Sequence, residues 1–263
     1  MDTVRSADGT EIAYERSGDG PPLIYVGGAL NDRFSGVPLA TELGPRMTVF
    51  RYDRRGRGAS GDTKPYAVER EFDDLHALVE AAGGEAAVYG MSSGGVLAMR
   101  AAASGLKFSK IAAYEPPIQP DSAATRRVVR EYNARLTELL AASRAGDAVE
   151  LFMAHVRTPA ELIGQMRHSP MWPALEAIGP SLAYDSAVMG DASGGPAPNE
   201  WVGAISVPTL VLRGGLSPAW MGDAATGLAD ALPRGRFRLI PDQTHDVSAE
   251  ALAPVLADFF LAG

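Results

Sequence analysis

One short stretch of the sequence combines two serines with closely spaced glycines: residues 90–95 read GMSSGG. Ser92 has a glycine two positions before it and another two positions after it, whereas Ser93 has a glycine only after it. At a tight turn between a strand and a helix, glycines at these positions remove side chains that would collide with neighbouring backbone. Such a turn lifts the serine hydroxyl into a cleft, where the free N–H groups of the following helix also point. The pattern predicts that Ser92 is a nucleophile and that Ser93 contributes its backbone.

A serine hydroxyl is a poor nucleophile until a neighbouring base takes its proton, and histidine is the usual base. The chain has four histidines. His76 falls within an expected helix, and His155 and His168 fall within a long helical segment. His245 follows the last expected strand, in a short loop that can face the strand ends. We therefore expect His245 to be the base, unless a histidine of the helical segment folds down onto Ser92.

Short apolar runs alternate with helical patterns along most of the chain. Apolar runs that end at glycine, aspartate or glutamate are typical of strands buried on both faces, and parallel strands need the crossover helices that lie between them. The sequence therefore predicts an α/β fold with a mostly parallel sheet and helices on both faces, preceded by an antiparallel hairpin around Asp8-Gly9. The expected strands cover residues 22–26, 47–52, 86–89, 111–114, 208–212 and 236–240, and the expected helices cover residues 67–82, 95–103, 219–231 and 250–261.

The alternation stops between residues 120 and 190, where only helical patterns occur. Expected helices cover residues 125–143, 147–156 and 159–166, followed by apolar pieces around Trp172 and Leu182, and a polar stretch over residues 190–199 leads back to the strands. We expect an α/β core made of residues 1–118 and 200–263, and a helical cap over residues 119–199. Ligands of such folds usually bind beyond the carboxyl ends of the strands, beside any domain laid over them.

The composition excludes several classes of function. The chain has 263 residues, 24 basic and 32 acidic, so its net charge is −8, and the lack of any long run of like charge makes nucleic acid a poor partner. The absence of cysteine excludes disulfides, thiolate nucleophiles and cysteine-ligated metals. No segment has the pattern of a membrane span or a secretory signal, and no metal motif is visible. We expect a cytoplasmic protein with a small-molecule substrate and no membrane partner, and its oligomeric state stays open.

Four stretches in the same order resemble the α/β-hydrolase superfamily, and the resemblance covers nearly the whole chain. They are residues 26–28 (VGG), residues 52–58 (YDRRGRG), the turn at Ser92 and residues 244–246 (THD). The serine turn and the late histidine are the specific signals. The resemblance implies an eight-stranded sheet with a helical cap, a serine–acid–histidine mechanism and no cofactor. It points to small capped esterases, lactonases and bromoperoxidase-like members.

The same resemblance assigns the backbone donors that stabilise an oxyanion. One is the N–H of Ser93, directly after the nucleophile, and the other is the N–H of Gly28, in the loop after an early strand.

The three arginines of residues 53–57 cannot act as bases, because they never lose their charge. We expect these arginines to fix a turn by ion pairs.

The acid that orients the histidine departs from the family pattern. Many members carry it after the strand that matches residues 209–212, where this chain has Ser217, and serine holds no negative charge. Some relatives carry it after the preceding core strand, where this chain has Glu115 between a buried strand and two prolines. We expect Glu115 to be the acid, because the prolines reduce the freedom it must lose. Asp223, Asp246 or no acid at all remain alternatives.

Together these residues predict a serine hydrolase that cleaves an ester or lactone of a small molecule through Ser92 and His245. Two other readings stay open. A member without a working acid would bind small molecules without turnover, and the same residues also serve C–C hydrolysis, lyase or perhydrolase reactions.

Overall fold

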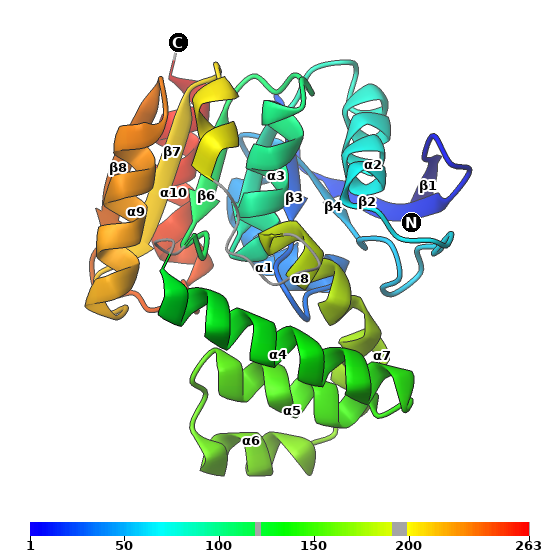
Figure 1. Ribbon diagram of the computed structural model, residues 1–263. Coiled ribbons are helices and arrows are strands. Elements are labelled where there is room, and N and C mark those ends of the chain that lie inside the picture. The colour runs from blue at the N-terminus through cyan, green and yellow to red at the C-terminus, as the bar shows by residue number, and fades with distance from the viewer. Residues whose placement is uncertain (119–121, 191–198, 263) are drawn as a thin grey trace.

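The structure is a computed structural model that describes residues 1–118, 122–190 and 199–262. Within these residues, eight strands form one sheet in the order β1-β2-β4-β3-β5-β6-β7-β8 (Figure 1). The pairs β1–β2 and β2–β4 are antiparallel and the other pairs are parallel. The predicted α/β fold with a mostly parallel sheet is confirmed. The strands are β1 (Asp2–Arg5), β2 (Glu11–Ser17), β3 (Pro22–Val26), β4 (Thr48–Tyr52), β5 (Ala87–Met91), β6 (Ile111–Tyr114), β7 (Thr209–Gly214) and β8 (Gly235–Ile240).

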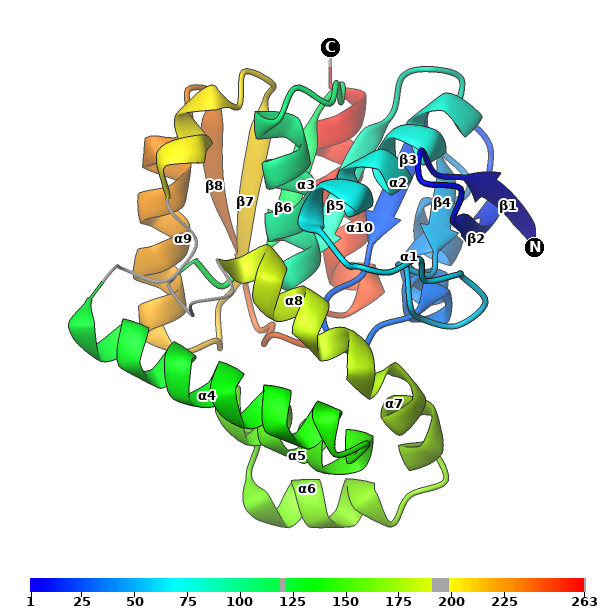
Figure 2. The same ribbon diagram turned by 45° about the vertical axis from the view of Figure 1, so that its right-hand side comes forward.

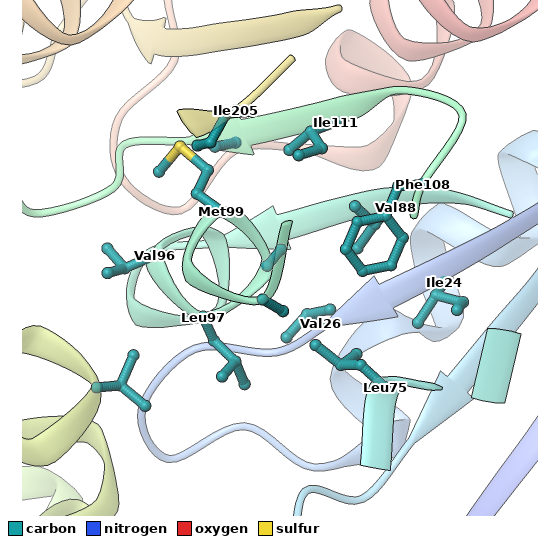
Figure 3. Packing of buried hydrophobic residues seen from close by; sticks show 14 of the residues in the cluster. Ile24, Val26, Leu75, Val88, Val96, Leu97, Met99, Phe108, Ile111 and Ile205 are labelled. Carbon is teal, nitrogen blue, oxygen red and sulfur yellow. The ribbon is translucent and has the colours of Figure 1, made fainter. Parts of the chain in front are cut away.

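Helices cover both faces of the sheet, which is why the central strands are continuously apolar. In β3, Ile24 and Val26 join one apolar cluster, whereas Leu23 and Tyr25 join the cluster on the opposite face. The first cluster includes α2 (Val68–Ala81), α3 (Ser93–Ala103) and α9 (Ala219–Ala231), and the second includes α1 (Val37–Leu43) and α10 (Ala249–Leu261). Val96, Leu97 and Met99 of α3 belong to the same cluster as Val26, Val88 and Ile111, and Figure 3 shows Leu97 on the side of Val26 and Met99 beside Ile205. This packing holds the start of α3 against the ends of β3 and β5.

The pair formed by the short helix η1 (Arg33–Gly36) and α1 was not expected from the sequence. Asp32 begins η1, since its carboxylate accepts hydrogen bonds from the N–H groups of Phe34 and Ser35. Helix α1 has only seven residues and buries Leu39, Ala40 and Leu43 against the sheet. A helix this short carries too few turns to produce a clear apolar period, so its formation depends on packing.

Between β6 and β7, the described residues 123–189 form helices, in line with the helical patterns of the sequence. Helices α4 to α8, here called the helical insertion, have an apolar cluster of their own, and α8 contacts α2 and α3 (Figure 2). Leu182 of α8 belongs to the cluster of the insertion and Val188 to that of the sheet, so α8 joins the two parts. The helices are α4 (Ala123–Ala141), α5 (Ala145–His155), α6 (Ala160–Arg167), α7 (Trp172–Ile178), η2 (Gly179–Ser181), α8 (Leu182–Met189) and, before β7, η3 (Asn199–Ala204).

Two expectations reach residues beyond those described. The polar stretch over residues 190–199 lies almost entirely outside the described residues, and so does the expected boundary at residue 119. Among the helices of the described ranges, none is both long and apolar enough to cross a membrane.

Candidate active site

The backbone at Ser92 has the conformation that the surrounding glycines predict. Ser92 lies between β5 and α3 with φ 53° and ψ −125°, which is unusual for a residue with a side chain. A Cβ on Gly90 would lie 2.5 Å from the carbonyl oxygen of Gly94, and one on Gly94 would lie 2.3 Å from the carbonyl oxygen of Val26. Both glycines are therefore required by close backbone packing, and the turn keeps Ser92 only half-buried.

The groups around Ser92 are suited to binding negative charge. The N–H of Ser93 is the first of helix α3 and donates to no acceptor among the described residues. The positive end of the α3 helix dipole therefore lies beside Ser92. Gly28 lies against the same turn, because a Cβ placed on it would be 3.1 Å from Cβ of Ser92. The structure thus brings together the three residues expected to form the nucleophile and the oxyanion hole.

The N–H of Gly28 is already engaged. It donates to Oδ1 of Asn31 at 3.0 Å, within the loop that follows β3. Residue Asn31 was not singled out in the sequence, since a loop asparagine has many ordinary roles. For Gly28 to bind an oxyanion, Asn31 has to release or share this N–H.

Glu115 and His245 form a hydrogen-bonded pair. Oε2 of Glu115 lies 2.7 Å from Nδ1 of His245, and Oε1 accepts the backbone N–H of Gly214 at 2.9 Å. Glu115 is 3% exposed and has φ 44°, so its side chain is held at the end of β6 in a strained backbone conformation. Because Nδ1 is occupied by the carboxylate, Nε2 is the nitrogen free to accept a proton.

The charge of Glu115 is stabilised by the surrounding donors. Burial acts to raise the pKa of this carboxyl, but the hydrogen bonds to His245 and to the N–H of Gly214, together with the nearby Ser217 hydroxyl, outweigh burial and hold the pKa below its ordinary value. Ser217 is buried, and among the described residues no partner lies within hydrogen-bonding geometry of its hydroxyl. Glu115 is therefore ionised at neutral pH.

Ser92 and the Glu115–His245 pair lie at adjacent strand ends. Met91 of β5 pairs with Tyr114 of β6, and the N–H of Ser92 donates to the carbonyl oxygen of Tyr114 at 2.9 Å. The Tyr114 hydroxyl in turn donates to the carbonyl oxygen of Thr244, the residue before His245. Ser92 and His245 are both among the described residues, and no hydrogen bond joins Oγ of Ser92 to the imidazole of His245. Such contacts are often long in the absence of substrate.

The other candidate residues are placed elsewhere. Asp223 and Asp246 are exposed, and neither forms a hydrogen bond or an ion pair with the imidazole of His245. His155 stacks on Tyr132 within the helical insertion, at 4.2 Å between ring centroids. Exposed side chains also include His76 on α2 and His168 after α6. Among the residues considered as acid or base, the structure pairs only Glu115 with His245.

The arginine-rich loop after β4 is a turn fixed by ion pairs, as expected. Arg54 makes a bidentate pair with Glu71 at 2.7 Å for both contacts, and Arg55 pairs with Asp74. Sequence reasoning missed a further partner, Asp185 of α8, since more than 100 residues separate it from the arginines. No local pattern marks such a residue.

The sequence and the fold of this chain are similar to those of known proteins. A family model described as the alpha/beta hydrolase family matches residues 23–257, and the chain belongs to that family. The expected superfamily is thus confirmed. An alpha/beta hydrolase from Sphaerobacter thermophilus DSM 20745 has 52% identity and a TM-score of 0.90, with coverage of 98% of this chain and 100% of that one.

Two more distant structures have the same fold. They are a thermophilic esterase from Thermogutta terrifontis (22% identity, TM-score 0.74, coverage 99% and 97%) and the enol-lactonase from Burkholderia xenovorans LB400 (21%, 0.70, 99% and 100%). Among curated proteins, the uncharacterized hydrolase YraK of Bacillus subtilis (strain 168) is 37% identical over 95 residues. That match spans 35% of this chain and 35% of YraK, about a third of its length.

Proposed function

We propose that this protein is a serine hydrolase that cleaves an ester or lactone of a small molecule. The observation that carries the proposal is the 2.7 Å contact between Glu115 and His245, made at the strand ends that also hold Ser92. Membership of the alpha/beta hydrolase family supports hydrolysis. The esterase and the enol-lactonase of the same fold are compatible with an ester or a lactone as substrate.

In the first half of the reaction, His245 takes the proton from Oγ of Ser92 while Oγ attacks the carbonyl carbon. The electron pair of the C=O bond moves to the oxygen, and the N–H groups of Ser93 and Gly28 donate to it. Glu115 holds the imidazole through Nδ1 and balances the charge of the imidazolium. His245 then gives its proton to the leaving alkoxide oxygen as the C–O bond breaks.

In the second half, His245 takes a proton from water, which attacks the acyl group on Ser92. The ester bond to Oγ breaks, the acid leaves, and Oγ recovers its proton from the imidazolium. The acid is non-standard in position but supplies the same charge. It does so from β6 rather than from the loop after β7, where Ser217 leaves no competing carboxylate.

A fluorophosphonate probe tests the proposal, because it reacts with a serine only when a base and an oxyanion site activate that serine. Wild type should be labelled and should hydrolyse short p-nitrophenyl esters or simple lactones, whereas Ser92→Ala should do neither. Ser109→Ala is the matched control, since Ser109 is exposed just before β6, at the opposite end of that strand. The control should behave as wild type.

The outcomes separate the alternatives. Absence of labelling in folded wild type would overturn the proposal and favour a protein that binds small molecules without turnover. Labelling at Ser92 without turnover of any ester or lactone would contradict the ester assignment and favour C–C hydrolysis or a lyase reaction.

A further inference from the structure

Asp185, on α8 of the helical insertion, is buried at the junction between the insertion and the sheet. Its Oδ1 accepts hydrogen bonds from Nη1 of Arg54 at 2.6 Å and from Oγ of Ser93 at 2.7 Å. Its Oδ2 accepts from Nη2 of Arg57 at 2.7 Å. One carboxylate therefore joins the helical insertion to the arginine-rich loop and to the start of α3.

Arg57 carries this link to the loop of the other proposed oxyanion donor. Its Nη1 donates to the carbonyl oxygen of Gly28 at 2.6 Å and to that of Asn31 at 3.0 Å. Two carbonyls of one loop are thus held by a guanidinium whose opposite nitrogen is held by Asp185. The planar guanidinium has a fixed geometry, so the position of Asp185 determines where the loop lies.

Ser93 carries the link to the second donor. Its side chain donates to Asp185 while its backbone N–H stays free beside Ser92. The first residue of α3 is therefore fixed from both sides, by packing of the helix on the sheet and by the carboxylate from the insertion. A shift of Asp185 would rotate or release the N–H of Ser93.

The charges show that Asp185 acts as an ion at this place. Arg54 and Arg57 are both buried, and the bidentate pair with Glu71 compensates only one of them. Burial acts to raise the pKa of Asp185, but Arg57, Arg54 and the Ser93 hydroxyl hold it below its ordinary value. The carboxylate is therefore charged, and its hydrogen bonds to Arg54, Arg57 and Ser93 are the strong, charge-assisted kind.

We propose that Asp185 is a positioning residue that ties the helical insertion to both oxyanion donors, Gly28 through Arg57 and Ser93 directly. The proposal rests on the proposed function. It gives the insertion a role in stabilising the transition state, besides any role in covering the substrate. Binding in the ground state depends much less on these donors, so kcat and KM respond differently to a loss of Asp185.

The experiment compares Asp185→Asn, Ser93→Ala and Asp147→Asn with wild type. Asp147→Asn is the matched control, because Asp147 lies on α5 of the same insertion and pairs with Arg144 and Arg167 at the surface. Each variant is assayed for kcat and KM on one p-nitrophenyl ester and for inhibition by a trifluoromethyl ketone, whose adduct with serine carries an oxyanion. Circular dichroism establishes folding.

Asp185→Asn should lower kcat about a hundredfold and weaken inhibition by the ketone to a similar extent, with KM within threefold of wild type. Ser93→Ala leaves no buried charge unpaired, and it should lower kcat and weaken inhibition about three- to tenfold. If Asp185→Asn does not fold, the result for Ser93→Ala tests the proposal instead. The pH profile of kcat/KM should keep its shape in both variants, because Glu115 and His245 are untouched.

Two results would overturn the positioning role. One is unchanged kcat and inhibition in the folded Asp185→Asn variant, or in Ser93→Ala if Asp185→Asn does not fold. The other is a higher KM with unchanged kcat, which would make Asp185 only an anchor of the insertion. If wild type is labelled by the fluorophosphonate, either of these results in the variants leaves the proposed function standing. Absence of labelling in wild type overturns both.

Discussion

The substitution Glu115→Gln removes one charge from the proposed triad and changes little else. Glutamine has the same size, and its amide oxygen can still accept the N–H of Gly214. Its amide NH₂ group, placed toward His245, would donate to Nδ1 and leave the ring proton on Nε2, the wrong tautomer for a base. The variant therefore loses both the charge that stabilises the imidazolium and the orientation of the ring.

The size of the loss follows from the 2.7 Å separation of Oε2 and Nδ1. For unit charges at that distance and an effective dielectric constant of about 20, Coulomb's law gives about 6 kcal/mol. The imidazole side chain is 42% exposed, and screening by water reduces the figure to about 4 kcal/mol. With about 1.4 kcal/mol for each tenfold change in rate, kcat should fall on the order of 10³-fold.

The assay is steady-state hydrolysis of p-nitrophenyl acetate, with thermal unfolding followed by circular dichroism to establish that the variant folds. Asp223→Asn and Asp246→Asn are the controls, because these carboxylates are exposed and form no hydrogen bond or ion pair with the imidazole. Both should keep kcat within about threefold of wild type. A folded Glu115→Gln protein with kcat within tenfold of wild type would refute the reasoning, as would an equally large loss in either control.

Two further predictions concern the same strand ends. Asn31→Ala frees the N–H of Gly28 to donate to the oxyanion. Since one hydrogen bond contributes about 0.5–1.5 kcal/mol, kcat for ester hydrolysis should rise about two- to tenfold. A fall in kcat would mean that Asn31 holds the N–H of Gly28 in place. The second prediction concerns pH: because the pKa of Glu115 is lower in the folded protein than in the unfolded chain, its ionised form stabilises the fold above the ordinary value of 4.5, and this contribution is lost as the pH falls below that value. Urea unfolding should show a stability difference between wild type and Glu115→Gln that shrinks as the pH falls below about 4.5; a difference that stays constant from pH 4.5 down to pH 3 would contradict the lowered pKa.

Local sequence determined the central strands, the longer helices and the turn at Ser92, whereas the short helices η1 and α1 depended on packing. Strands such as β3 are buried on both faces, so their residues are continuously apolar and readable without a structure. Gly90 and Gly94 have no side chain because the backbone of α3 and β3 passes within van der Waals distance of them. Features of this kind are set by a few neighbouring residues, and the sequence shows them directly.

The tertiary structure decided which distant residues meet. Glu115 was one of several possible acids, and its contact with His245 depends on the placement of β6 beside β7 and of the loop after β8. Asp185 reaches Ser93 only because α8 packs on α3, and the capture of the Gly28 N–H by Asn31 depends on how one loop closes. Each of these contacts is a single hydrogen bond between residues whose types are common in loops and helices. Their pairing is set by the packing of the whole chain, and no periodic pattern in the sequence records it.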